Sequence, residues 1–200
     1  MIQLSMIETD EQRDIARRIV ETHHSYVPSF DSVGRRIDWF VLVDERIVGV
    51  IGVGSATYPP CKDVLRHLGI TKKQYKGVFN NIANNWRFCM TEKIPNAGTQ
   101  ILKLLRIHAK YEWRKKYGDE LKYILTFVGG GHNGAVYLAD NWLKIGETAG
   151  LPEHNAVSMK WDGEEQLKQK FVKPTGEDRK IIFFKDLRKT PPLILTDTLF

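Results

Sequence analysis

The sequence predicts an α+β fold in which helices flank a mixed sheet, and three observations carry that prediction. The chain has 200 residues, of which 42% are hydrophobic and 27% are charged, which is typical of a soluble globular domain. Segments with helical spacing and β-rich segments follow one another along the chain. Its central part reads strand, loop, long helix, strand, the order of a crossover between two parallel or nearly parallel strands.

The N-terminal part predicts a helix followed by a hairpin. Residues 9–12, Thr-Asp-Glu-Gln, have the form of a helix capping box, and apolar residues then recur at helical spacing to about residue 23. The β-rich runs 37–43 and 46–53 are separated by two polar residues, which predicts an antiparallel hairpin. Residues 56–75 contain two consecutive prolines and are expected to be irregular.

The C-terminal part predicts the crossover and the end of the sheet. The expected elements are a strand over 86–90, a break at 95–98, a long helix over 99–116, a short buried strand over 124–128, a helical or mixed segment over 135–143, and a final strand over 181–184. We expect one domain over residues 1–162 and a C-terminal extension over residues 163–200 that could add the last strand.

Composition narrows the class of partner and the compartment. The formal net charge is +6 and the pI is near 9.2, which favours polyanionic partners but is shared by many enzymes. The two cysteines lack the close spacing of a zinc or redox motif, so free thiols in a reducing compartment are expected. No apolar run reaches the roughly 20 residues of a membrane span. A cytoplasmic protein without membrane association is therefore expected.

The start of the long helix is a candidate anion site. The segment from Pro95 to Thr99 precedes the helix, whose first backbone N–H groups lack intrahelical partners and favour an anion. Asn96, Gly98 and Thr99 are the candidate cofactor-binding residues. The simpler interpretation is an ordinary helix start with Asn96 as the capping side chain, and the single glycine favours it.

One face of the same helix is basic. Lys103, Arg106, Lys110 and Arg114 recur along it, which predicts either a surface that follows DNA phosphates or a solvated helix face. In both cases we expect these side chains to face away from the core, because four desolvated cations in one row are prohibitively costly.

A glycine-rich loop follows the strand at 124–128. Four glycines surround His132, and such loops let the backbone approach a ligand or let the histidine project from a tight turn. His132 is a candidate acid, base or metal ligand, and Tyr137 follows five residues later. The alternative is a glycine turn with an incidental histidine, but the entropic cost of so many glycines favours function.

Several further polar or aromatic residues are candidates of lower specificity. His23 and His24 could serve a metal or cap the C-terminus of the first helix. Arg87 alternates within an apolar strand, where an arginine needs a partner or an anion. Asn84, Asn85, Asn141 and Trp142 could contact base edges or stack on bases.

These residues occur in a recognisable order. Residues 131–142 with Gly146 resemble the pattern G-H-x-G-x-x-Y-x-A-x-N-W-x-x-x-G of phage Mom proteins. Residues 85–88 resemble the short arginine-bearing strand of that family, 96–99 its Asn-x-x-Ser helix start, and 23–26 its His-Tyr-Ser region. The resemblance covers about residues 15–150. It implies a GNAT-like fold and conversion of adenine in double-stranded DNA to N6-carbamoylmethyladenine or a related N6 adduct, which protects phage DNA from restriction.

The resemblance also assigns roles to residues. It makes Arg87, Thr99, His132 and Tyr137 the functional candidates, with His132 or Tyr137 moving the proton of the adenine amine. The donor could be acetyl-CoA-like or glycine-derived, and an iron-dependent route is conceivable. The Mom family has an aspartate shortly before its Gly-His, where this chain has glycine at 129 and 130.

The same Gly-x-x-Tyr-x-Ala-x-Asn-Trp pattern resembles a domain of Druantia-type antiphage systems. That domain has Thr-Phe-Val-Asp where this chain has Thr-Phe-Val-Gly at 126–129. Two other functions therefore stay open: a noncatalytic DNA-binding module of a defence system, and a GNAT acyltransferase with a different substrate.

Overall fold

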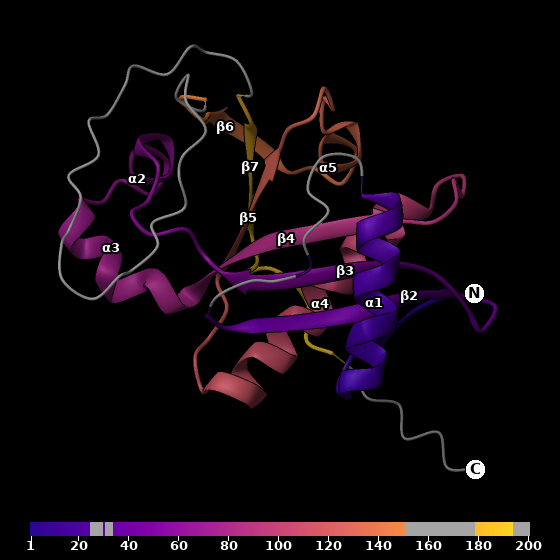
Figure 1. Ribbon diagram of the computed structural model, residues 1–200. Helices are drawn as coiled ribbons and strands as arrows, with labels where there is room; N and C mark the ends of the chain where they lie inside the picture. The colour runs from indigo at the N-terminus through magenta and orange to yellow at the C-terminus, as the bar shows by residue number, and fades with distance from the viewer. Residues whose placement is uncertain (25–29, 31–33, 151–178, 194–200) are drawn as a thin grey trace, which may run out of the picture.

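The computed structural model describes residues 1–24, 30, 34–150 and 179–193, and in that part of the chain a mixed seven-stranded sheet has helices on both faces (Figure 1). The strands are β1 (Ile2–Met6), β2 (Arg36–Val43), β3 (Arg46–Ser55), β4 (Ile82–Met90), β5 (Tyr123–Val128), β6 (Leu143–Glu147) and β7 (Ile181–Asp186). The helices are α1 (Asp10–His23), α2 (Lys62–Leu68), α3 (Lys72–Val78), α4 (Ala97–Tyr117) and α5 (Ala135–Ala139), with a 3-10 turn at Phe79–Asn81. The predicted α+β class is confirmed.

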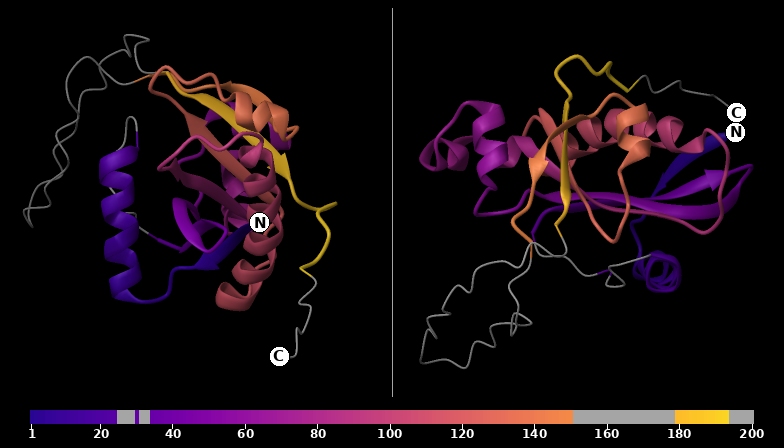
Figure 2. Two further views of the ribbon diagram at one scale, coloured as in Figure 1. Left: turned by 90° about the vertical axis from the view of Figure 1, so that its right-hand side faces the viewer. Right: turned by 90° about the horizontal axis from the view of Figure 1, so that it is seen from above.

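The strand order is β1-β2-β3-β4-β5-β7-β6, and β4 and β5 are the parallel pair among the described strands. The long helix α4 makes the crossover between them. Helices α1 and α4 lie on opposite faces of the sheet (Figure 2). Val50 of β3 packs under α1, and its neighbour Ile51 packs under α4, because successive side chains of a strand point to opposite faces.

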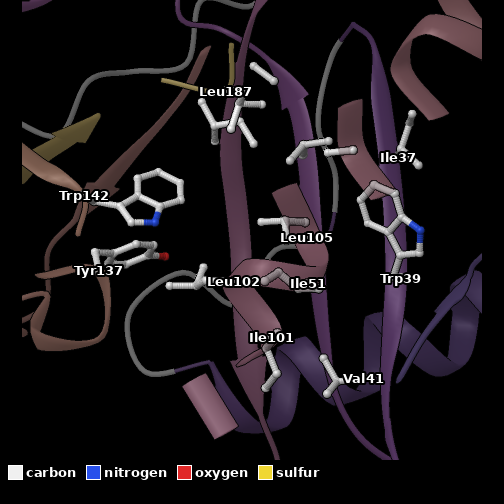
Figure 3. Close-up of a cluster of buried hydrophobic side chains, with 14 of the residues drawn as sticks. Ile37, Trp39, Val41, Ile51, Ile101, Leu102, Leu105, Tyr137, Trp142 and Leu187 are labelled. Carbon is white, nitrogen blue, oxygen red and sulfur yellow. The ribbon is translucent and has the colours of Figure 1, made fainter. Parts of the chain in front are cut away.

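The largest part of the core lies between α4 and the sheet (Figure 3). Leu102 and Leu105 of α4 are fully buried against Trp39 and Ile51 of the sheet. Burial of each such side chain stabilises the fold by about 1.5–3 kcal/mol. Tyr137 belongs to the same cluster, so the segment after the glycine-rich loop is fixed to the core.

Strands β4 and β5 separate after a short parallel contact. They pair only at residues 82–84 with 123–125, although each strand continues for at least three residues. Strand β4 also has a bulge at Trp86, because Asn85 lies opposite Val53 and Arg87 lies opposite Gly52. A bulge re-aims the side chains that follow it. Asn85 consequently faces α4, whereas Trp86 and Arg87 share the face that α1 covers.

Glycine is required at position 52 of β3, beside that bulge. A Cβ atom there would lie 2.1 Å from a carboxylate oxygen of Asp38 and 2.6 Å from the indole nitrogen of Trp86. The indole nitrogen donates to Asp38 at 2.9 Å, and Arg36 forms an ion pair with the same carboxylate. The bulge is therefore fixed by a buried polar contact with β2.

Several predicted elements are confirmed. The Thr9–Gln12 capping box is present, with reciprocal hydrogen bonds at the start of α1. The hairpin of β2 and β3 turns at Asp44 and Glu45, both with positive φ. The strands predicted over 86–90 and 124–128 form parts of β4 and β5, and the long helix is α4.

Three predictions about the fold are wrong or incomplete. Residues 56–75 are not irregular, because α2 and the start of α3 lie there. Strands β1 and β6 were not expected. The strand at 181–186 is confirmed. It lies between β5 and β6, inside the sheet and not at its edge. The predicted boundary near residue 162 lies outside the described residues. No described helix has the length and apolarity needed to cross a membrane.

Candidate functional site

A cavity of about 350 Å³ lies where β4 and β5 separate. The end of α1, both strands, the glycine-rich loop and α5 supply its walls. The polar and aromatic residues that line it are His23, His24, Asn85, Trp86, Phe88, Thr126, Phe127, His132, Asn133 and Tyr137. The opening between the two strands thus exposes polar groups that a fully paired sheet would have sealed.

Three buried polar side chains form the wall on the α4 face. The Tyr137 hydroxyl donates to Oδ1 of Asn85 at 2.9 Å, and the Thr126 hydroxyl donates to the Asn85 carbonyl at 3.1 Å. The two hydroxyl oxygens are 3.5 Å apart. The Asn85 amide also donates to the carbonyls of Gly52 and Arg87. Because buried polar groups are costly without partners, this network holds the phenol in one orientation.

The opposite wall is basic. His24 at the end of α1 is half-buried, and burial lowers its pKa to about 4, with the positive charges of Arg87 and His132 acting in the same direction. His24 is therefore a neutral imidazole near pH 7. His132 is exposed on the glycine-rich loop and lines the cavity. His132 lines this cavity but Arg87 does not, so the predicted common pocket of these two residues stays a prediction.

Arg87 directly follows Trp86, the residue at the bulge of β4. Its guanidinium lies 4.5 Å from the centre of the Trp86 ring and donates to the Trp86 carbonyl at 2.7 Å. Trp86 lines the cavity, whereas Arg87 is not among its lining residues. Cys89, two residues on, also faces α1, and burial raises its pKa to about 11, so it stays an uncharged thiol.

The start of α4 lines a second cavity of about 460 Å³ that adjoins the first. The two cavities share Phe88, Met90 and Val136 as lining residues. Ala97 and Gly98 contribute the first turn of the helix. Helix start and glycine-rich loop were predicted to line one pocket; they line neighbouring cavities with a common wall.

The structure corrects the simpler interpretation of Asn96. Its backbone is left-handed, with φ of 58°, and its side chain makes no capping hydrogen bond. Packing explains the glycine at position 98, because a Cβ atom there would lie 2.4 Å from a methyl group of Val136. Thr99 follows, half-buried, in the first turn. The first turn of α4 thus lies against α5 without a side-chain cap.

The prediction that the basic row of α4 forms one exposed surface is wrong. Arg106 has a side chain only 14% exposed and forms an ion pair with Asp140. Asp140 also accepts a hydrogen bond from the Trp142 indole at 2.8 Å. Trp142 is 3% exposed, so it is a core residue and does not offer a ring for base stacking. Asp140 is engaged by these two residues and does not orient Tyr137.

The remaining members of the predicted DNA surface have different environments. Lys110 donates to the carbonyls of Leu187 and Thr190 at 3.3 and 3.2 Å, which ties α4 to the segment after β7. Lys103, Arg114 and Asn141 are exposed. Their predicted contact with DNA stays a prediction.

A metal site at His23 and His24 is not supported by the described residues. Those residues contain no group of three or more His, Cys, Asp or Glu side chains arranged to hold a metal ion, so the iron-dependent route has no ligand set there. Ser25 and Tyr26, which complete the predicted His-Tyr-Ser region, lie outside the described residues.

Sequence reasoning missed Thr126, and it expected Asn85 to contact bases and not to form a buried hydrogen bond with Tyr137. Asn85 is the centre of the buried network, yet in the sequence it is one of two adjacent asparagines before an apolar strand. Its burial between β3 and β4 distinguishes it from Asn84. Thr126 lies within an apolar run, where a threonine is common in any strand. No local pattern could have identified either group, because their partner Tyr137 comes from a distant helix.

Comparison with known proteins places the chain in a family. The model of the family described as Druantia protein DruA matches residues 1–150. The chain belongs to this family. The predicted resemblance to a Druantia domain is thereby confirmed, whereas membership of the Mom family stays a prediction. No curated protein matches the chain.

Solved structures support the predicted GNAT-like fold of this Druantia family member. An N-acyl amino acid synthase, FeeM, from uncultured soil microbes has a TM-score of 0.55 at 13% identity, covering 94% of this chain and 92% of that chain. The ribosomal-protein-S18-alanine N-acetyltransferase of Escherichia coli has a TM-score of 0.51 at 10% identity, with 100% of both chains covered. The aminoglycoside acetyltransferase AAC(6')-Ib, in complex with coenzyme A, has a TM-score of 0.51 at 9% identity, covering 93% and 95%. At these identities the likeness establishes the fold alone.

Proposed function

We propose that this protein transfers an acyl group from a thioester to the nitrogen of an amine. The observation that carries the proposal is the oriented Tyr137 hydroxyl in the cavity between β4 and β5, with a neutral imidazole, that of His24, on the opposite wall. A proton donor and a proton acceptor that face one cavity are what amine acylation needs. The N-acyl and N-acetyl transferases that share the fold support this class of reaction.

A coenzyme A-type thioester is the proposed donor. AAC(6')-Ib, which shares the fold, is in complex with coenzyme A. The second cavity, lined by Ile94, Ala97, Ile101 and Val136, offers apolar walls to the arm of such a donor. The first turn of α4 offers backbone N–H groups to its phosphates. This assignment keeps Gly98 and Thr99 as candidate cofactor-binding residues through their backbone.

In the proposed reaction, Tyr137 and a histidine carry out different proton transfers. The thioester supplies an activated acyl carbonyl. The amine nitrogen forms the new C–N bond as the C–S bond breaks, and the sulfur leaves as a thiolate. Tyr137 donates a proton to that sulfur after its hydroxyl turns away from Oδ1 of Asn85, to which it donates in this structure, and the proton taken from the amine nitrogen replaces the one that Tyr137 gives up. His24 or His132 accepts the proton that the nitrogen loses. The products are an N-acyl amine and a free thiol, and no oxidant or metal is required.

The finer proposal is that the acceptor is the N6 amine of adenine in DNA. The net charge of +6 and membership of a Druantia family support a polyanionic partner connected with phage defence. Acylation at N6 requires a base that has been flipped out of the duplex. An acyl thioester gives an N6-acyl adduct, whereas the carbamoylmethyl group of the Mom reaction needs a glycine-derived donor.

Mass spectrometry of nucleosides tests the finer proposal. DNA from cells that express the wild-type chain is compared with DNA from cells that express Tyr137→Phe. We expect a 2′-deoxyadenosine adduct heavier by one acyl group in the first sample and its loss in the second. An unmodified nucleoside pool in both samples, although the purified protein acylates amines, would exclude DNA adenine as the acceptor.

The noncatalytic DNA-binding module stays the second candidate, and Gly129 favours it. The related domain has aspartate at this position, whereas here a Cβ atom would lie 3.0 Å from the Lys180 side chain. The site therefore does not accommodate the related aspartate without a shift of Lys180. Salt-dependent DNA binding by a protein that releases no thiol from any thioester would decide for this candidate.

A further inference from the structure

The helices α2 and α3, which lie between β3 and β4 in the chain, carry a dense group of exposed cations. Residues 61–78 contain five lysine and arginine residues and one carboxylate, so their formal charge is +4, against +6 for the whole chain. All five cationic residues are exposed: Lys62, Arg66, Lys72, Lys73 and Lys76. These five residues are called the α2–α3 basic surface below.

The one carboxylate of this segment is directed toward the sheet. Asp63 is the only aspartate or glutamate in the sequence between Glu45 and Glu92. Its side chain is 16% exposed, pairs with Arg66 and packs against β6 at Gly146, where a Cβ atom would overlap the carboxylate. Within the described part of the chain, no ion pair engages the four lysines. Only one of the five cations is therefore neutralised there.

The long helix α4 is also rich in cations, but the fold uses several of them. Arg106 pairs with Asp140. Lys110 donates to two carbonyls of the segment after β7, and Lys116 donates to the Arg36 carbonyl. A phosphate that bound these groups would have to replace contacts that stabilise the fold. The lysines of α2 and α3 impose no such cost.

Buried side chains fix α2 and α3 on the sheet. Val64 of α2 and Tyr75 of α3 are 1% and 0% exposed, and they pack with Leu125 of β5 and Ile182 of β7. The neighbouring Ile124 belongs to the core beneath α4. Because successive side chains of a strand point to opposite faces, α2 and α3 lie on the face that α1 covers, with α2 beside β6 (Figure 1).

The same face borders the cavity between β4 and β5. Phe127 lines this cavity and packs against the cluster that fixes α2 and α3. His24, at the end of α1, also lines the cavity. The proposed donor lies at the start of α4, on the opposite face of the sheet (Figure 2). An acceptor that enters from the α1 face therefore passes beside the α2–α3 basic surface.

We infer that the α2–α3 basic surface binds the phosphate backbone of double-stranded DNA beside this cavity. The inference rests on the DNA acceptor of the proposed function and names the surface that holds it, in place of the row first predicted on α4. Ammonium groups on a fixed scaffold release counterions from DNA when they bind phosphates. Phosphate contacts set the position of a duplex but do not read its sequence, so this surface leaves recognition of the base to the cavity.

Two triple variants with the same net charge test the inference. The α3 variant carries Lys72→Gln, Lys73→Gln and Lys76→Gln. The α4 variant carries three changes at exposed positions of the other helix, Lys103→Gln, Arg114→Gln and Lys115→Gln. Binding of each full chain to a fluorescent duplex of about 20 base pairs is measured by anisotropy between about 50 and 200 mM salt. Thermal melts verify that the variants stay folded, as expected for exposed substitutions.

The α3 variant should bind the duplex at least about tenfold more weakly than the wild type, with a salt dependence shallower by about 0.9 for each lost phosphate contact. The α4 variant should keep the wild-type salt dependence. Arginine at the same three α3 positions should preserve binding, because the charge is retained. Equal losses in the α3 and α4 variants, an α3 variant that binds like the wild type, or a wild type that does not bind the duplex would overturn the inference.

A parallel measurement separates this inference from the proposed function. Thiol release from acetyl-CoA is followed with aniline, a small amine that needs no DNA surface, and the α3 variant should match the wild type. Weakened DNA binding by the α3 variant, with no thiol release by the wild type, would refute acyl transfer and support the inference. Thiol release by a protein whose α3 variant binds DNA normally would support acyl transfer and overturn the inference.

Discussion

At the scale of single residues, the site depends on the buried contact between Tyr137 and Asn85. The phenol is 7% exposed and the amide is 4% exposed, so each needs the other as its hydrogen-bond partner. The Tyr137 hydroxyl, the proposed proton donor, therefore also stabilises the fold. The two roles can be separated because the aromatic ring, not the hydroxyl, fills the core volume beside Trp142 and Phe183.

Tyr137→Phe should lower the free energy of unfolding by about 1–3 kcal/mol, because it leaves Oδ1 of Asn85 buried without that donor. Denaturant unfolding measures the change. Tyr111→Phe is the control, because that hydroxyl lies on the exposed face of α4, and no comparable change is expected there. A Tyr137→Phe protein as stable as the wild type would show that the hydrogen bond does not hold the phenol.

The contact between Gly98 and Val136 predicts a compensating pair. Gly98→Ala should destabilise the fold by about 1–3 kcal/mol, because its new methyl group would overlap the Val136 side chain. Val136→Ala should relieve that overlap, so the double variant should be more stable than the sum of the two single changes predicts. Additive effects in a double-mutant cycle would contradict the close approach of α4 and α5.

At the scale of elements, local patterns account for α1, α4 and the β2–β3 hairpin. The capping box, the helical spacing and the two-residue turn each act within a few residues, so the sequence reveals them. Helices α2 and α3 have seven residues each, too few for a periodic pattern, and the consecutive prolines before them indicated a loop. Strand β6 is mostly exposed at the edge of the sheet, so it lacks the apolar alternation that identifies a strand.

The wrong prediction that Arg106 and Trp142 are exposed has a similar cause: the residues that bury them lie elsewhere in the chain. Arg106 looked solvent-exposed because its own helix shows a basic row. Its partner Asp140 lies 34 residues away and reaches it only after the β5–α5 unit folds back onto α4. Trp142 is buried by the same packing. The residues of one helix face therefore predict the solvent exposure of that face only where no other element packs against it.

The Arg106–Asp140 pair should hold α5 against α4. Arg106→Met should destabilise the protein by about 3–5 kcal/mol, because it leaves the Asp140 carboxylate buried without its cation. Arg114→Met should change stability by less than about 0.5 kcal/mol, since its side chain is exposed on the same helix. Thermal and denaturant unfolding compare the two. Similar effects of both changes would return Arg106 to the solvated face first predicted.

At the scale of the whole molecule, the sheet opens between β4 and β5 and places an α1 histidine opposite an α5 tyrosine. Stability should respond to that arrangement through His24. Its pKa is lowered to about 4 from an ordinary 6.5, so between those values the unfolded chain binds the extra proton. The His24 contribution to stability is therefore present above about pH 6.5 and is lost as pH falls toward 4.

The wild type should consequently lose stability between pH 6.5 and 4 more steeply than His24→Gln, which cannot titrate there. Unfolding by denaturant at several pH values measures both slopes. Equal slopes for the wild type and His24→Gln would show that His24 is not held neutral by the fold.

The central claim is that the β4–β5 opening transfers an acyl group with Tyr137 as proton donor. The most direct measurement is thiol release from acetyl-CoA by the purified full chain, with an aromatic amine as acceptor. We predict amine-dependent release by the wild type, and a rate lower by a factor of about 100 or more for folded Tyr137→Phe. Release that does not depend on the amine, or equal rates for the two proteins, would contradict the claim.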